Sequence, residues 1–472
     1  FNGGGVAGGA VPTPNIDAIG RQGVAFANGY DGNATCAPSR AAIMTGRYPT
    51  RFGFEFTPAP VNFSRLLATM PVQGSSHPTQ FLSDNARHMP GRDALAVPAS
   101  EITIAELLRG RGYHTVHLGK WHLGGVAGTR PEQQGFDESL GFIDGGSMYR
   151  MPGDPSVVDA RQTFDPIDTF MWPNLRDGVQ FNGSPQFHPN TYMTDYLTDN
   201  AISAIQANRN RPFFIYLAYN APHIPLQAPR ADYDALSGIH DHRLRVYAAM
   251  IRNLDRNIGR VMQALHDQGV DDNTLVIFTS DNGGAWYLGL PDINRPYRGW
   301  KATFFEGGIH SPFFMRWPGH IAPGTTFPRP VGHIDIFSTA AAAAGAGTPR
   351  DRPIDGVNLL PFIQGQAHGD PHHALFWRSG AYRAVLSEGW KLQVLDDPHR
   401  VWLFNLAVDP TERRNLAASE PAQVARLQAL LAQQDRQSVR PLWPTVLRGP
   451  IPIDHPWPVQ DRPGDEYINW DN

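Results

Sequence analysis

The chain has 472 residues and a formal net charge of −4, with 41% hydrophobic and 18% charged residues. This composition is typical of a folded globular protein, and the length is sufficient for one large domain plus a smaller one. Neither a basic stripe for nucleic acid nor an apolar run of the roughly 18 residues needed to span a membrane occurs. We therefore expect no nucleic-acid partner and no membrane span.

Three short apolar strands, each preceded by a helix, are predicted between residues 100 and 280. The predicted helix and strand pairs are 102–108 with 113–118, 192–207 with 212–218, and 244–265 with 274–278. Buried strands that alternate with helices favour parallel pairing with both faces of the sheet covered. We predict an α/β fold with a large, mixed, mostly parallel sheet flanked by helices.

Beyond residue 365 the pattern changes to short strands separated by turns. These predicted strands are 374–378, 382–386, 390–395 and 401–404, and an amphipathic helix follows over 421–437. They indicate a smaller antiparallel sheet with a helix. We therefore expect a catalytic domain over 1–368 and a small C-terminal α+β subdomain over 369–472.

Polar clusters follow the three predicted strands of the main sheet. They are residues 119–122 (Gly-Lys-Trp-His), 221–223 (Ala-Pro-His) and 280–283 (Ser-Asp-Asn-Gly). Ligand sites in such sheets lie beyond the carboxyl ends of the strands, so we expect the clusters to converge. Taken singly, each has an ordinary interpretation: a solvated lysine, a structural histidine and a turn.

Residues 36–40 (Cys-Ala-Pro-Ser-Arg), followed by 45–47 (Thr-Gly-Arg), resemble the signature of the type I, formylglycine-dependent sulfatases. These arylsulfatase-like enzymes belong to the alkaline phosphatase superfamily. Further matches occur in the family's order at 13–17, 112–122, 221–225, 280–283 and 298–308, and two more landmarks stand at 355–356 and 409–412. One departure is His310, which stands where the family usually has arginine.

The resemblance implies that Cys36 is oxidised to formylglycine by a formylglycine-generating enzyme. A hydrated aldehyde carries two hydroxyl groups on one carbon. One of them would attack the sulfur of a sulfate monoester, and the other would later expel sulfate as the aldehyde reforms. A plain serine would instead leave a stable sulfate ester, which explains why the chemistry requires the modification.

The resemblance also implies a role for each matching polar residue. Arg40 would hold the aldehyde hydrate, and Lys120 and Lys301 would clamp the sulfate oxygens. His122 would take up the proton when sulfate is expelled. His223 would contact sulfate and help to protonate the leaving oxygen, a role that Lys301 would share. Cations around the sulfate are needed because its oxygens carry the negative charge.

A single divalent metal ion, Ca²⁺, is implied as well, with Asp281, Asn282 and the modified Cys36 as its ligands. Hard oxygen donors of this kind suit Ca²⁺. The family also carries an acidic pair some way before residues 13–17, and residues 1–12 contain no acid. We interpret the sequence as truncated at its N-terminus, and we expect the chain as written to bind the metal poorly and to be inactive.

The sequence thus predicts a sulfuric ester hydrolase that acts on a small-molecule or carbohydrate sulfate ester. Two alternatives stay open. One is a phosphonate or phosphate ester hydrolase of the same superfamily, although a two-metal phosphatase would show more His and Asp ligands. The other is an inactive homologue that binds an anion. We expect a periplasmic or secreted location, with a cytoplasmic one also open.

Overall fold

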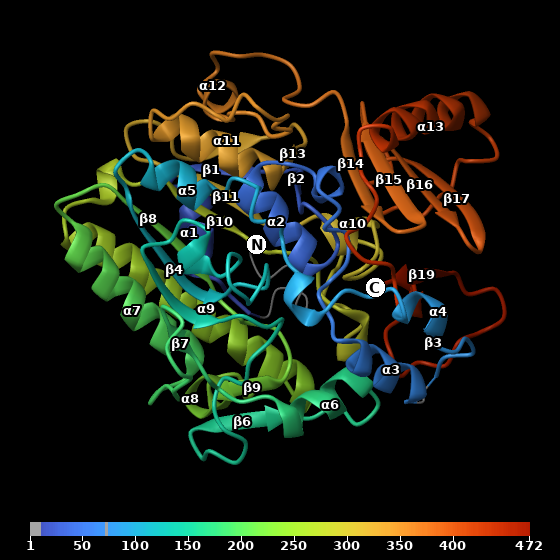
Figure 1. Ribbon diagram of the computed structural model, residues 1–472, viewed down its shortest axis with the longest axis horizontal. Helices are drawn as coiled ribbons and strands as arrows, with labels where there is room; N and C mark the ends of the chain where they lie inside the picture. The colour runs from blue at the N-terminus through green and yellow to red at the C-terminus, as the bar shows by residue number, and fades with distance from the viewer. Residues whose placement is uncertain (1–10, 71–73) are drawn as a thin grey trace.

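The computed structural model describes residues 11–70 and 74–472 of the chain (Figure 1). The expected N-terminal truncation depends on residues 1–12. Most of these residues lie outside the described ones, so the expectation stays a prediction. No helix among the described residues is both long enough and apolar enough to cross a membrane.

The first half of the main sheet is mostly parallel. Its order is β7 (Gln180–Phe181), β5 (Glu138–Phe142), β4 (His114–Lys120) and β8 (Phe213–Ala218). The central strand β4 pairs in parallel with β5 and β8, whereas β7 runs antiparallel to β5. Strands β4 and β8 coincide with the predicted strands over 113–118 and 212–218. Strand β5, which is short and contains a glycine, was not predicted from the sequence.

The second half of the main sheet is mixed. Its order is β10 (Val276–Thr279), β11 (Phe313–Arg316), β1 (Val24–Phe26) and β12 (Thr325–Phe327). Strand β11 is antiparallel to both of its neighbours, and β1 pairs in parallel with β12. The predicted α/β class is confirmed, and in the described residues the main sheet consists of two four-stranded parts that are not hydrogen-bonded to each other.

Strands β8 and β10 lie on either side of a cavity of about 1270 Å³. Its lining includes most of both strands, apolar side chains such as Ile251 and Leu254 on one side, and Ile336 on the other. The lining continues to Arg40 and Asp281, which are polar residues. The carboxyl ends of β4, β8 and β10 therefore meet at one end of this cavity.

Helices cover both faces of the main sheet (Figure 1). One face carries α1 (Pro14–Arg21), α7 (Met193–Asn208) and α9 (His242–Asp267), and α8 (Arg230–Asp234) packs on α9. The other carries α2 (Cys36–Thr45), α5 (Ile104–Arg109) and α11 (Ile334–Ala343). Helix α5 starts at a capping box, in which Thr103 and Glu106 bond each other's backbone amides. The long helix α9 buries a stripe that includes Val246, Met250 and Leu254.

The C-terminal sheet is antiparallel throughout. Its strands are β14 (Leu375–Ser379), β15 (Tyr382–Ser387), β16 (Trp390–Asp396) and β17 (His399–Asn405), and α13 (Pro421–Asp435) packs on β15 and β16. All four strands and the helix agree with the predicted pattern. One hydrophobic core contains residues of both regions, among them Trp286 and Trp377, and the domain boundary at 368 stays a prediction.

Residues 55–98 and 143–190 show little periodicity in the sequence, and in the structure they contain short elements. They hold α3 (Val61–Thr69), β3 (Gln80–Phe81), α4 (Ser83–Ala86), β6 (Val157–Ala160) and α6 (Pro166–Asn174). Pairing with distant strands explains part of this order. Strand β6 pairs with β9 (Leu226–Pro229), and β3 pairs with β18 (Leu447–Pro452), which pairs in turn with β19 (Tyr467–Asp471). The remaining elements are β2 (Gly29–Tyr30), β13 (Val331–Gly332), α10 (Glu306–Ile309) and α12 (Leu360–Ile363).

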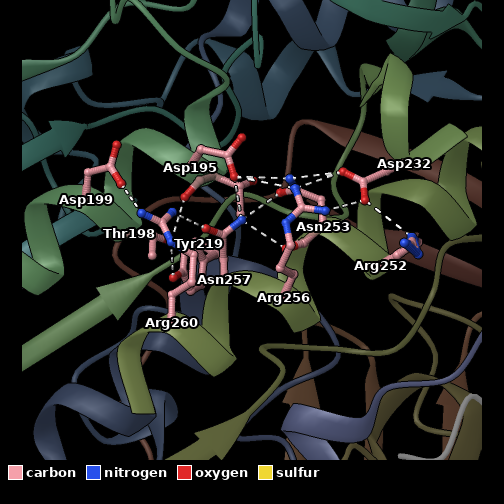
Figure 2. A network of polar contacts seen from close by, with 11 residues as sticks. Asp195, Thr198, Asp199, Tyr219, Asp232, Arg252, Asn253, Arg256, Asn257 and Arg260 are labelled. Carbon is pink, nitrogen blue, oxygen red and sulfur yellow. Dashed lines mark hydrogen bonds and ion pairs between the residues drawn. The ribbon is translucent and has the colours of Figure 1, made fainter. Parts of the chain in front are cut away.

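Figure 2 shows a polar network in which acidic residues of α7 and α8 face arginines of α9. The carboxylate of Asp232 is buried and accepts a hydrogen bond from Arg256 at 3.0 Å. Asp199 pairs with Arg260 instead, and both of those side chains are about half exposed. Water screens an exposed pair, whereas a buried carboxylate depends on its partner. We therefore expect the two pairs to differ in their contribution to stability.

Replacing Asp232 with alanine is expected to lower the free energy of unfolding by about 1–3 kcal/mol, because Arg256 loses its buried acceptor. Asp199→Ala is the matched control and should cost less than about 1 kcal/mol. Urea denaturation followed by circular dichroism measures both. Equal losses of unfolding free energy in the two variants would contradict the expectation that the buried Asp232–Arg256 pair stabilises the protein more than the exposed Asp199–Arg260 pair.

Candidate active site

Cys36 is the first residue of helix α2, directly after the extended residue Thr35. Its side chain is buried, and the helix ends where Gly46 adopts a left-handed conformation with φ of 66°. A Cβ at Gly46 would lie 2.7 Å from the Cβ of Phe337, so the turn can accommodate only glycine. Residue 36 thus stands at the N-terminus of α2, where the helix dipole favours negative charge.

Four further side chains come together around Cys36. The Lys301 ammonium donates a hydrogen bond to the Cys36 Sγ atom at 3.0 Å. His122 and His223 also form hydrogen bonds with this thiol, and Lys120 acts on it through its charge. These residues come from the end of β4, the turn after β8 and the loop before α10. The structure thus brings the predicted catalytic residues to one place, and their roles stay predictions.

Arg40 lies one helical turn after Cys36 and links two strand ends. Its Nε donates to Asp281 Oδ2 at 2.8 Å, and its Nη1 donates to the backbone oxygen of Lys120 at the same distance. Burial alone would raise the pKa of Asp281, but the Arg40 guanidinium outweighs it, so this pKa is lowered. Asp281 is therefore ionised at neutral pH, and Arg40 holds the ends of β4 and β10 together.

The charge around Cys36 favours its ionised form. Burial opposes ionisation of the thiol, but the ammonium groups of Lys120 and Lys301 and hydrogen bonds from His122 and His223 outweigh it. The pKa of the Cys36 thiol therefore lies well below its ordinary value. Such a site stabilises negative charge at residue 36, whichever group carries that charge.

In a preparation that lacks the modification, we expect the rate at which Cys36 reacts with iodoacetamide to have its inflection well below the ordinary thiol pKa. The lowered pKa of the Cys36 thiol means that the thiolate, which is the reactive form, persists to a lower pH than in a free cysteine. Lys301→Met should move the inflection of the rate to higher pH, because one of the two cations is removed. An inflection at the ordinary thiol value in the unmutated chain would contradict this electrostatic account.

The two histidines of the site are neutral near pH 7. Burial lowers the pKa of His122 to about 4, with the Lys120 ammonium adding to the effect of burial. Burial and Lys120 also lower the pKa of His223. Burial likewise lowers the pKa of Lys120, to about 8, although the Cys36 thiolate counters it. Neutral histidines beside ammonium groups are suited to accept a proton during a reaction.

Asp281 and Asn282 fit a hard divalent cation in the type of their donor atoms. Both residues line the cavity, and the Asn282 Oδ1 atom is buried without a hydrogen-bond partner. Among the described residues, no group of three or more His, Cys, Asp or Glu side chains could hold a metal ion. These two residues therefore supply only part of the roughly six to eight oxygen ligands that Ca²⁺ prefers.

We expect the 472-residue chain to bind Ca²⁺ weakly, with a Kd above about 10⁻⁴ M, because two protein oxygens make an incomplete shell. Isothermal titration calorimetry measures this constant directly. Asp281→Asn should weaken the binding further, since it removes the carboxylate charge. Tight binding by the unmutated chain would contradict the prediction and would require ligands beyond these two residues.

Several residues that contact the predicted set were not found from the sequence. Tyr287 is buried and forms a side-chain hydrogen bond with Lys301, and the Tyr216 hydroxyl lies 3.3 Å from Arg40 Nη1. His333 contacts the motif at 36–40, because its Nδ1 atom lies 3.0 Å from Ser39 Oγ. The contacts of Tyr216 and His333 join residues 176 and 294 positions apart, so no local pattern in the sequence indicates them.

Comparison with known proteins supports the resemblance to sulfatases over most of the chain. The family model described as Sulfatase matches residues 1–346, and the one described as N-sulphoglucosamine sulphohydrolase, C-terminal, matches residues 298–438. The chain is 30% identical over 391 residues to the protein named uncharacterized sulfatase YdeN of Escherichia coli (strain K12). That match covers 77% of the chain and 59% of the relative.

Two further relatives are similar at the same level. Human N-acetylgalactosamine-6-sulfatase is 33% identical over 373 residues, which are 76% of the chain and 62% of that protein. The crystal structure of Ps i-CgsB in complex with k-i-k-neocarrahexaose has a TM-score of 0.74 and 29% identity. It covers 92% of the chain and 89% of the solved one.

The chain thus spans about six-tenths of the length of the two curated relatives. It spans nearly the whole of the solved structure. The residues gathered around Cys36 lie in the region that the first family model matches. Because that model covers residues 1–346, well over half of the described protein, the chain belongs to the sulfatase family.

Proposed function

We propose that the protein is a sulfuric ester hydrolase that cleaves a sulfate monoester through a formylglycine hydrate derived from Cys36. The observation that carries the proposal is the placement of Cys36 at the start of α2, within hydrogen-bonding distance of Lys301. His122, His223 and Lys120 act on the same atom. Two ammonium groups, two imidazoles and a helix N-terminus are what a sulfate anion and its transition state require.

The Cys36 Sγ atom stands where the hydroxyl oxygens of the aldehyde hydrate would be. One hydroxyl loses its proton to solvent, and the resulting alkoxide oxygen attacks sulfur, so that a new O–S bond forms and the bond from sulfur to the ester oxygen breaks. His223, with Lys301, supplies a proton to that leaving oxygen. His122 then takes the proton of the second hydroxyl, the C–O bond to sulfate breaks, and the aldehyde reforms. Bound sulfate favours the protonated form of His223, which burial and the neighbouring ammonium groups of Lys120 and Lys301 otherwise disfavour.

Asp281, Asn282 and the hydrate oxygen at residue 36 would hold the divalent metal ion, for which we propose Ca²⁺. When bound, it would offset negative charge on the sulfate and favour ionisation of the hydrate. Arg40 keeps Asp281 ionised and fixes its orientation, as their 2.8 Å contact supports. Thus Arg40 acts on the metal ligand as well as on residue 36.

We also propose that the substrate is a carbohydrate sulfate ester. Two similar proteins support this class. One is named N-acetylgalactosamine-6-sulfatase, and the other, Ps i-CgsB, was solved in complex with k-i-k-neocarrahexaose. The loop after β5 supports a substrate-facing role for part of the aperiodic segment 143–190. A Cβ built on Gly145 would lie 2.7 Å from His122 Cε1, and one on Gly146 would lie 3.5 Å from His223. Close approach of these glycines leaves the loop in contact with both catalytic histidines.

The maturation partner follows from the same proposal. A formylglycine-generating enzyme would act on residues 36–40 before the chain folds, because Cys36, Ser39 and Arg40 are buried in the folded protein. The family resemblance also favours export to the periplasm or the exterior. Fractionation of the natural host, with immunodetection of the protein, tests the location.

The decisive test is the mass of the tryptic peptide of residues 22–40, taken from protein isolated from its natural host. Conversion of Cys36 to formylglycine lowers that mass by about 18 Da. Activity towards p-nitrophenyl sulfate and sulfated sugars, with Ca²⁺ in excess, is measured on the same sample. A shifted peptide with sulfatase activity supports the proposal. Preferred hydrolysis of a phosphonate ester would establish the first alternative, and an unshifted, inactive protein that binds sulfate would establish the second.

A further inference from the structure

The loop that carries Lys301 is attached to the C-terminal sheet by buried charged groups. This loop and the short helix α10 form the segment of residues 298–310, called here the Lys301 segment. Lys391 of β16 contacts Glu306 Oε1 of this segment at 2.7 Å and Glu412 Oε1 at 3.1 Å. The side chains of Lys391 and Glu412 are fully buried, and that of Glu306 is nearly so.

Glu412 also contacts the backbone of the Lys301 segment. Its Oε2 accepts a hydrogen bond from the Glu306 amide at 2.6 Å, and its Oε1 accepts one from Gln393 at 3.0 Å. Glu412 adopts a left-handed conformation with φ of 56°, which is unfavourable for a residue with a side chain. Glu412 is the last residue of the landmark 409–412, which resembles the family's pattern. The proposed mechanism assigns no role to this landmark.

The opposite side of the same segment reaches the active site. The Lys301 amide donates to the Gly284 oxygen at 2.9 Å, and the Ala302 amide donates to the Ala34 oxygen at 2.8 Å. These bonds join the segment to the loop after β10 and to the turn before Cys36. The segment is therefore held between the C-terminal sheet on one side and the reacting residues on the other.

Stability alone is a weak reason for such a group of charges. Two carboxylates and an ammonium lose hydration when buried, and apolar residues of similar size often stabilise a protein equally well. Charged groups instead impose one geometry, because each donor must meet its acceptor. Burial raises the pKa of Glu306, but Lys391 and His310 outweigh this and lower it, so Glu306 is ionised and depends on Lys391.

We propose that Lys391 and Glu412 are positioning residues for Lys301, acting through Glu306 and the backbone of the Lys301 segment. The C-terminal sheet thereby sets the place of an ammonium group that binds sulfate. The inference rests on the proposed function, because it takes Lys301 as a sulfate-binding group. Neither residue is among those that contact Cys36: Lys391 contacts Glu306 and Glu412, and Glu412 also contacts Gln393.

The test compares Lys391→Met with a matched control, Arg378→Met. Arg378 of β14 contacts the fully buried Glu55 with its Nε at 3.0 Å from Oε2, so this control also removes a cation from a buried carboxylate beside the C-terminal sheet. Hydrogen–deuterium exchange is measured on peptides that cover 298–310. We expect exchange there to rise about tenfold or more in Lys391→Met and to stay unchanged in Arg378→Met. Unchanged exchange in Lys391→Met would overturn the proposal.

A double-mutant cycle tests the link to Lys301. Lys391→Met is expected to lower kcat/KM about 10–100-fold and to weaken binding of inorganic sulfate by about tenfold. In a Lys301→Met background the same substitution should change either value less than about twofold, because the positioned group is already removed. An undiminished effect in that background would show that Lys391 acts on the fold generally, and would overturn the proposal.

Two further variants guard against misfolding. Glu412→Gln retains an oxygen for the Glu306 amide and should give a smaller loss than Lys391→Met, while Lys391→Arg should restore part of the sulfate affinity. Circular dichroism verifies that each variant is folded. If the unmutated protein neither hydrolyses sulfate esters nor binds inorganic sulfate, the proposed function fails. In that case, hydrogen–deuterium exchange of the Lys301 segment still tests whether Lys391 holds this segment in place.

Discussion

Replacing Cys36 with serine is expected to lower turnover of a sulfate ester by at least about 10³-fold, because the nucleophile loses its second hydroxyl group. A serine hydroxyl that attacks sulfur yields a sulfate ester with no neighbouring group to expel the sulfate. The remaining site is intact, since Lys301 and the two histidines still surround residue 36. The loss should therefore appear in kcat, with little change in affinity for the substrate.

Mass spectrometry of the peptide of residues 22–40 distinguishes this mechanism from simple inactivation. If serine attacks once and is then trapped, the peptide of the incubated Cys36→Ser variant gains a sulfate group, an increase of about 80 Da. Cys36→Ala is the control and should remain unmodified and equally inactive. Multiple turnovers by either variant would contradict the assignment of residue 36 as the nucleophile.

Lys301→Met is expected to lower kcat/KM by about 10²–10³-fold, the second largest effect among the predictions. The ammonium lies 3.0 Å from the atom that represents the nucleophile, where charge on the sulfate oxygens develops. Methionine has nearly the same length and removes the charge while retaining the packing. If Lys301 also shares in protonating the leaving oxygen, the loss should be larger for esters with poor leaving groups.

Rates measured for a series of aryl sulfates with different phenol pKa values test that dependence. The slope of log kcat/KM against leaving-group pKa should be steeper in Lys301→Met than in the unmutated protein. His223→Ala provides the comparison, because His223 is assigned the same proton transfer. A loss below tenfold in Lys301→Met, with an unchanged slope, would contradict both roles of the lysine.

Local patterns in the sequence determined most of the elements that carry the site. Apolar strands that end in polar residues placed Lys120, His223 and Asp281 at strand ends, and the structure has β4, β8 and β10 at those positions. The motif at 36–40 indicated the nucleophile, and its neighbours in the chain form a single turn of α2. Periodicity and short motifs act over at most about 20 residues, which is the range in which sequence patterns are informative.

Contacts between distant residues were decided only by the tertiary structure. Lys301 meets Cys36 across 265 positions, and Arg40 meets Asp281 across 241. No pattern in the sequence indicated the contact between Lys391 and Glu306, because Lys391 lies in β16 and Glu306 in the distant helix α10. The sequence by itself thus determined which residue types are present and which strand ends they follow. Their distances depend on how the sheet halves and the C-terminal sheet pack, because packing is a property of the whole chain.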